Sequence, residues 1–129
     1  MSIYTDEELN RTVSIEDISQ MENEKLALLL MCGALKFRYR GNLINQIGLA
    51  DFADDIEFAE RYLACMQAEV EASQRVLDDA AISNNQTVNQ FLFRQGSDPQ
   101  TTLEFFTERL RFAHIDLKRA QGFLAECRA

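Results

Sequence analysis

Few residues of this chain have the types and spacing that catalysis or metal binding requires. Glu57 and Glu60 stand three residues apart, which places two carboxylates on one face of a helix, within reach of a shared Mg²⁺. A complete site needs a second acidic pair on a facing helix, and Glu69 and Glu71 lack that spacing. The single histidine, His114, excludes a di-iron bundle, which requires Glu-x-x-His on two helices. We therefore expect no catalytic residue, no metal and no cofactor, and predict that the protein is not an enzyme.

The cysteines and the hydropathy of the chain indicate where the protein resides. Cys32, Cys65 and Cys127 are odd in number and widely spaced, and no C-x-x-C pair is present, so neither a disulfide framework nor a zinc site is indicated. The acidic N-terminus lacks the basic start of a signal peptide. The longest apolar stretch, residues 26–35, is far shorter than the ~20 residues of a membrane-spanning helix. These features predict a cytoplasmic protein.

The net charge of −8 is distributed unevenly along the 129 residues. Residues 1–25 carry −5 and residues 51–79 carry −7, whereas residues 26–50 carry +3 and residues 80–129 carry +1. A negatively charged protein repels polynucleotides unless its basic side chains gather in one place. Broad nucleic-acid binding is therefore not expected, and neither is binding to a membrane.

Helix-forming residues dominate the chain, which contains only one proline. We predict a single all-α domain over residues 1–129, folded as an antiparallel helical bundle. Three long helices are expected at about 15–40, 51–79 and 99–126, joined by short connecting helices. Residues 26–35 are apolar on every side, so the first long helix should be the central one.

The predicted helix boundaries rest on capping signals. Thr5, Ser14 and Asp98 are side chains that cap helix N-termini, and Pro99 follows Asp98 at the first helical position. Gly41 follows a run of bases, as at the C-terminal end of a helix. We therefore expect Gly41 to end the first long helix.

The last two long helices have more apolar residues than one heptad seam uses. Phe105, Phe112 and Ile115 lie about 100° or more from the main seam of the last helix. A similar second ridge in the helix at 51–79 consists of Phe58, Tyr62, Cys65, Ala72 and Val76. One alternative is that each helix packs against two neighbours. The other is that one ridge is exposed as a homodimer or partner interface, and the ridge with Phe105 is the favoured candidate.

An acidic cluster is a candidate for protein docking. Asp54, Asp55, Glu57 and Glu60 crowd the start of the helix predicted at 51–79. Part of this charge suits the N-terminal end of the helix dipole. The remainder would attract a basic partner and make its binding sensitive to salt.

A basic run is a candidate for anion contact. Lys36, Arg38 and Arg40 alternate with aromatic residues, a pattern that can bind phosphate or stack on bases. The alternative is a solvated helix end, whose cations complement the dipole and pair with acids of the helix at 51–79.

These exclusions leave a protein that works through its surfaces. The favoured hypothesis is a small acidic cytosolic module that docks on a larger basic protein, for example one that handles nucleic acid, and regulates or inhibits it. Anti-defence, antitoxin and immunity proteins of similar size and charge suggest this by analogy. One alternative is an oligomeric structural or scaffold subunit, and another is nucleic-acid contact through the patch at residues 36–40. No motif in the sequence encodes the partner or the pathway.

Overall fold

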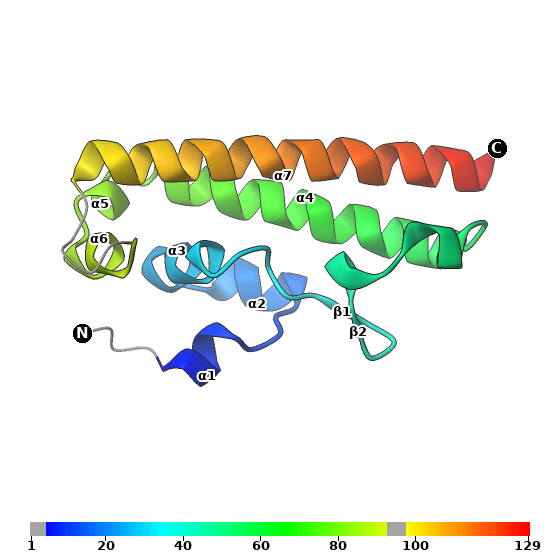
Figure 1. The fold of residues 1–129 in the computed structure, drawn as a ribbon, viewed down its shortest axis with the longest axis horizontal. Coiled ribbons are helices and arrows are strands. Elements are labelled where there is room, and N and C mark those ends of the chain that lie inside the picture. The colour runs from blue at the N-terminus through cyan, green and yellow to red at the C-terminus, as the bar shows by residue number, and fades with distance from the viewer. Residues whose placement is uncertain (1–4, 93–97) are drawn as a thin grey trace.

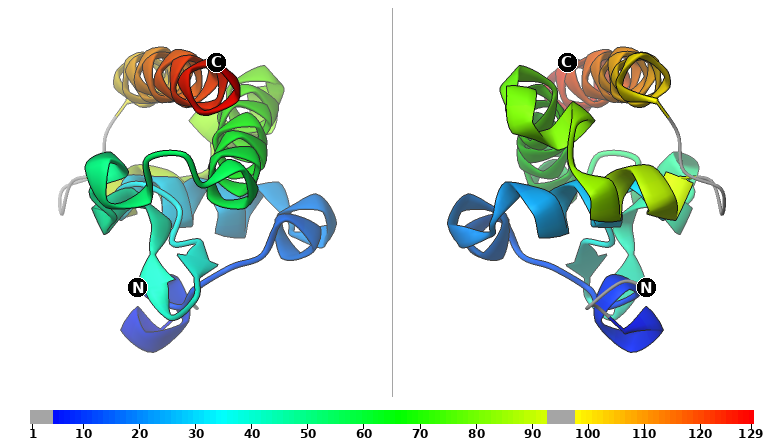
Figure 2. Two further views of the ribbon diagram at one scale, coloured as in Figure 1. Left: turned by 90° about the vertical axis from the view of Figure 1, so that its right-hand side faces the viewer. Right: turned by 90° about the vertical axis from the view of Figure 1, so that its left-hand side faces the viewer.

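A computed structural model describes residues 5–92 and 98–129 and confirms the all-α class. Its upper layer consists of two long antiparallel helices, α4 (Ile56–Asp78) and α7 (Pro99–Arg128), which lie side by side along most of their length (Figure 1). The second layer lies beneath this pair (Figure 2). It contains α2 (Ile15–Gln20), α3 (Asn23–Met31) and a short antiparallel hairpin of β1 (Arg38–Tyr39) and β2 (Asn42–Leu43).

Short elements complete the fold. They are α1 (Asp6–Leu9), two 3-10 helices η1 (Ile44–Gln46) and η2 (Leu49–Phe52), α5 (Ala80–Ser83) and α6 (Gln86–Leu92). α5 and α6 lie together at the end of the molecule where α4 ends and α7 begins (Figure 1). α1 lies below the second layer, far from the pair of long helices (Figure 1).

The prediction of one continuous helix at 15–40 is wrong. Met21 and Glu22 have extended ψ angles of 143° and 147°, and they separate α2 from α3. α3 ends at Met31, and Gly33 follows with a φ of 116°, a left-handed conformation that stops the helix. The chain is not helical again until after the hairpin.

The basic run forms a strand and turn rather than a helix end. Leu35, Phe37 and Tyr39 are buried, with exposed fractions of 2%, 1% and 8%, while the residues between them lie nearer the solvent. This period of two is that of a strand. Arg40 and Gly41 have φ angles of 49° and 85°, as in the two-residue turn that matches strand twist. Gly41 therefore closes a hairpin, and its predicted role as a helix cap is wrong.

The capping signals locate the N-termini of three helices correctly. Thr5, Ser14 and Asp98 each accept a hydrogen bond from the backbone N–H three residues later, at 3.1, 3.1 and 2.7 Å. α4 begins later than the predicted residue 51. Asp54 has a left-handed φ of 69°, and Asp55 caps the helix by accepting from the N–H of Phe58 at 3.0 Å.

The core lies between the two layers. Five consecutive residues of α3, Leu26 to Leu30, are at most 5% exposed, which confirms that this segment is central. The second apolar ridge of α4 also faces the core. Its members are 0–6% exposed, and they are Phe58, Tyr62, Cys65, Ala72 and Val76. The α4 ridge therefore packs inside the protein.

An aromatic cluster joins four segments around Phe58. The ring centroid of Phe58 lies 4.5 Å from that of Phe52, 5.2 Å from Tyr39, 5.9 Å from Tyr62 and 5.8 Å from Phe123. These rings come from η2, β1, α4 and α7. Most of the pairs are edge-on or tilted, arrangements that add to the gain from burial. The cluster fixes the hairpin beneath one end of the long helix pair.

Glu69 is fully buried on α4 and connects both layers. Its Oε1 accepts hydrogen bonds from the N–H of Leu35 and from Arg109 Nη2, both at 3.0 Å. Arg109, on α7, also donates to the carbonyl oxygens of Leu30 at 3.1 Å and Gly33 at 2.8 Å. One ion pair thus ties the two long helices to the end of α3 and the loop after it.

The cysteines differ in accessibility, and we expect their reactivity to differ accordingly. Cys32 is exposed, Cys127 is half-buried, and Cys65 is fully buried. Burial raises the pKa of the Cys65 thiol to about 11, so little thiolate forms there at pH 8. Iodoacetamide at about pH 8 should modify Cys32 first and leave Cys65 intact until denaturant is added, as read by peptide mass spectrometry. Equal rates at Cys32 and Cys65 would contradict this packing.

Candidate protein-docking face

Arg75 on α4 connects three segments of the chain. Its Nε donates to Asn23 Oδ1 at 2.7 Å, its Nη1 to the carbonyl of Ile18 at 3.1 Å, and its Nη2 to the carbonyl of Met21 at 2.7 Å. Asn23 Nδ2 in turn donates to Asp79 Oδ2 at 2.8 Å. The C-terminus of α2, the start of α3 and the end of α4 are therefore held together around one guanidinium.

Several carboxylates lie on the elements that meet at this junction. Glu71 and Asp78 flank Arg75 at spacings of four and three, so all three lie on one stripe of α4. The other acids come from α2, the start of α3 and the residue after α4. We name as the acidic face Glu16, Asp17, Glu22, Glu71, Asp78 and Asp79.

The charge of the acidic face is poorly neutralised within the fold. Arg75 donates to Asn23 and to two carbonyl oxygens rather than to a carboxylate. Within the part of the chain that the structure describes, no carboxylate of the acidic face lies within 4.0 Å of a basic group. Asp79 also stays ionised, because the hydrogen bonds from Asn23 and from the N–H of Ala81 lower its pKa.

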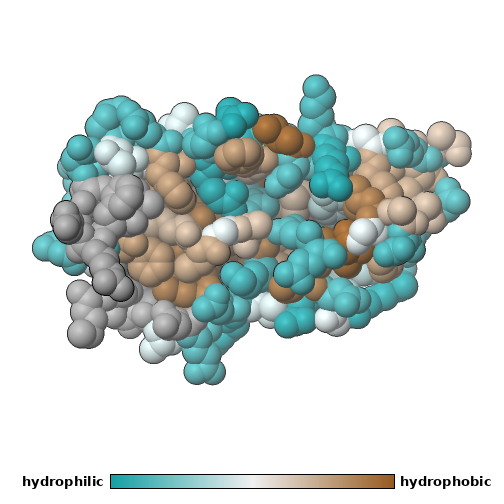
Figure 3. All heavy atoms as spheres, viewed as in Figure 1, coloured by the Kyte–Doolittle hydropathy of each residue, from teal (hydrophilic) through white to brown (hydrophobic). Residues whose placement is uncertain are grey.

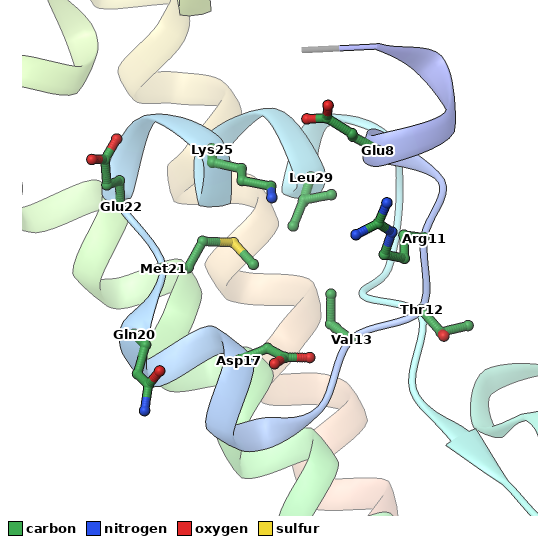
Figure 4. Close-up of a pocket in the computed structure, with 10 residues that line it drawn as sticks. All are labelled: Glu8, Arg11, Thr12, Val13, Asp17, Gln20, Met21, Glu22, Lys25 and Leu29. Carbon is green, nitrogen blue, oxygen red and sulfur yellow. The ribbon is translucent and has the colours of Figure 1, made fainter.

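Hollows flank α2 on both sides. One, of about 210 Å³, lies between α2 and α4 and is lined by Ile15, Ile18, Glu71 and Arg75, among others. The other, of about 380 Å³, lies between α1, α2 and α3. Figure 4 shows the residues that line the larger hollow. Arg11 and Lys25 point into it beside Val13, Met21 and Leu29, and the carboxylates of Glu8, Asp17 and Glu22 lie farther from its middle.

The acids predicted from the sequence as a docking surface lie elsewhere, at the start of α4. Glu57 is 3.6 Å from Arg40, and Glu60 is 3.6 Å from Arg128. Asp55 caps α4, and Asp54 is exposed. Two of these four carboxylates thus have cations beside them, although exposed pairs of this kind contribute little stability. Their role in docking stays a prediction.

The predicted anion-contact residues lie along the extended segment and turn of the hairpin. Because successive side chains of extended chain point to opposite faces, Lys36 and Arg38 share one side, and Arg40 follows in the turn. Arg38 Nη1 donates to the carbonyl of Gly41 at 2.9 Å. The Arg40 guanidinium lies over the Tyr39 ring, 5.0 Å from its centroid, and also pairs with Glu57 of α4. Nucleic-acid contact through this hairpin stays a prediction.

The apolar ridge predicted on the last helix is partly exposed. Phe112 and Ile115 are 48% and 50% exposed, and the Arg111 guanidinium lies 4.7 Å from the centroid of the Phe112 ring. Phe105 is half-buried and packs edge-on against Phe106, at 5.2 Å between centroids. α7 therefore differs from α4, whose second ridge is buried.

Across residues 5–92 and 98–129, the structure shows no group of three His, Cys, Asp or Glu side chains arranged to hold a metal ion. In the same residues, no helix combines the length and the apolar composition that crossing a membrane requires. Comparison with protein-family models, with curated proteins and with solved structures finds no match to this chain.

The docking acids predicted from the sequence lie at the start of α4, whereas the acidic face consists of other residues from the same two acidic segments, 1–25 and 51–79. The signal for Glu71 and Asp78 was present, since both share a helical stripe with Arg75. The approach of α2 to this stripe had no signal, because it depends on carbonyl oxygens that become available only where α2 ends.

Proposed function

We propose that this protein is a protein-binding module that docks its acidic face on a basic surface of a larger protein and so regulates or inhibits that protein. The observation that carries the proposal is that the six carboxylates of the acidic face, on segments that meet near Arg75, form no ion pair in the described residues. A surface of this kind accelerates the encounter with a basic partner and disfavours acidic ones.

The smaller hollow beside α2 supports the same proposal. An arginine or lysine side chain has an apolar stem and a charged end. In the smaller hollow, the stem would lie against Ile15 and Ile18, and the charged end would reach Glu71, while the Arg75 guanidinium is already bound by Asn23 and two carbonyl groups. Anchoring side chains of this type contribute much of the binding energy at protein interfaces.

The proposal predicts a salt-sensitive complex. The tagged full chain, incubated with an extract of its native host at about 50 mM salt, should retain one predominant basic protein. In titrations with that purified protein, the affinity should fall about tenfold or more between about 50 mM and about 300 mM salt, because screening weakens attraction between charged surfaces. An affinity that does not change with salt, or the absence of a basic partner, would contradict the proposal.

A second candidate function is that of a self-assembling structural or scaffold subunit. The observation that favours it is the exposure of Phe112 and Ile115 on α7, since soluble monomers seldom expose neighbouring large apolar residues without a binding role. This candidate predicts a defined oligomer of the isolated chain, whereas the docking module needs a different protein.

A further inference from the structure

One stripe of α7 is exposed and carries an ordered sequence of chemical types. We name as the α7 ridge Phe105, Glu108, Phe112, Ile115, Arg119 and Gly122. Their alternating spacing of three and four places them on one side of the helix. Glu108, Phe112, Ile115, Arg119 and Gly122 are exposed, and Phe105 is half-buried. The space-filling view shows apolar atoms among polar ones along this helix (Figure 3).

The α7 ridge is complementary to a second copy of itself that runs in the opposite direction. If a second copy lies antiparallel, with the twofold axis between Phe112 and Ile115, then Phe112 faces Ile115 of the second copy. In that register Glu108 faces Arg119 of the second copy, and Phe105 faces Gly122 of the second copy. In this register an acid meets a base, an apolar side chain meets another, and a large ring meets a glycine. The twofold axis makes each of these contacts occur twice.

The charges favour this orientation over the parallel one. A parallel pair in register would set Glu108 against Glu108 and Arg119 against Arg119, and such like-charge contacts are repulsive. Within the described residues, Arg119 has no carboxylate within 4.0 Å, so its charge is available to a second copy. Glu108 is bound on one side by Arg111 of its own chain and is otherwise exposed.

Gly122 has no evident role in the monomer. A Cβ added there would meet no atom within 4 Å, and its φ is not in the left-handed region, so the fold of one chain would accept a larger residue. Glycine inside a helix lowers helix stability relative to alanine. A residue without a side chain does, however, leave room for a large ring from a facing helix. The antiparallel register places Phe105 of the second copy against Gly122.

We propose that two copies of this chain form a twofold homodimer through antiparallel contact of their α7 ridges, with Glu108 and Arg119 paired across the axis. The proposal rests on other residues than the acidic face. The part of the acidic face that α2 contributes lies in the second layer, beneath the long helices and away from the proposed dimer contact (Figure 2).

Sedimentation equilibrium of the full chain between about 10 μM and about 1 mM tests the proposal. We expect the apparent mass to rise from 14.8 kDa toward twice that value as concentration increases. Glu108→Arg and Arg119→Glu should each weaken the dimer about tenfold or more, since each sets like charges against one another. The variant that carries both changes restores opposite charges and should recover to within about threefold of the unmodified chain. Glu71→Arg, on α4, is the control for charge reversal outside the ridge and should leave the dimer unchanged.

Gly122→Leu supplies a second, independent measurement. It should raise the thermal midpoint of the monomer, because leucine favours helix over glycine, and at the same time weaken the dimer by blocking Phe105 of the second copy. A chain that remains at 14.8 kDa at about 1 mM overturns the proposal. A dimer that is insensitive to both single charge reversals, or that the combined variant fails to restore although circular dichroism shows it folded, overturns it as well.

Discussion

Replacing Glu69 by alanine is expected to lower the free energy of unfolding by about 3–5 kcal/mol, the cost of removing one partner from a buried ion pair. The Arg109 side chain is only 13% exposed, so the substitution would leave its charge mostly buried with no carboxylate opposite. The N–H of Leu35 would lose its acceptor as well. Urea unfolding at about pH 7, followed by circular dichroism, measures the loss.

A matched control comes from the same helix. Glu71 is exposed, so Glu71→Ala should change the free energy of unfolding by no more than about 0.5 kcal/mol. If Glu69→Ala cost no more than Glu71→Ala, the ion pair with Arg109 would not hold the layers together as described.

Glu69→Gln isolates the effect of the buried charge. Burial raises the pKa of the Glu69 carboxyl above its usual range, against the opposing effects of the Leu35 N–H and of Arg109. A raised pKa in the folded state means that the carboxyl contributes most to stability below its unfolded pKa of about 4.5 and loses that contribution as the pH rises through the folded pKa. The stability of the unmodified chain, relative to the Gln variant, should therefore fall as the pH rises above about 4.5. A difference that is constant or grows with pH would contradict the direction of the shift.

Phe58→Ala should lower the free energy of unfolding by about 3–5 kcal/mol, the usual cost of removing a buried aromatic ring. Phe58 is fully buried and has four other rings within 6 Å of its own, so the remaining cavity cannot close without moving several segments. Thermal and urea unfolding of the full chain measure the effect.

Ile56→Ala is the control for this substitution, since Ile56 is on the same helix and is 41% exposed. It should cost about 1 kcal/mol or less. Equal losses at the two positions would contradict the placement of the aromatic cluster in the core.

Much of the helical part of the fold could be predicted because its signals are local. The caps at Ser14 and Asp98 and the uniformly apolar residues 26–35 each act within a few residues of chain. The extended segment that leads into β1 also had a local signal, since apolar and basic residues alternate there before Gly41, but the same bases before a glycine also match the C-terminal end of a helix. This difference does not affect the all-α class, but it places Lys36, Arg38 and Arg40 in the hairpin region instead of at the end of a helix.

The contacts that organise the candidate site were harder to predict because they join distant segments. Glu69 occupies a position in the buried ridge of α4, between Cys65 and Ala72, and an acid at such a position indicates a buried basic partner. The sequence does not say that the partner is Arg109. Arg75 binds backbone carbonyl groups, and every residue carries such a group, so no residue pattern could identify its acceptors.

The most direct test of the docking proposal compares two variants of equal charge in binding to the basic partner at about 50 mM salt. One variant carries Glu16→Gln, Glu22→Gln and Glu71→Gln in the acidic face. The other carries Asp54→Asn, Glu57→Gln and Glu60→Gln at the start of α4, so that each removes three negative charges from the net −8. We predict that the first variant binds about tenfold or more weakly and that the second stays within about twofold of the unmodified chain. A loss confined to the second variant, or equal losses in both, would contradict docking through the acidic face.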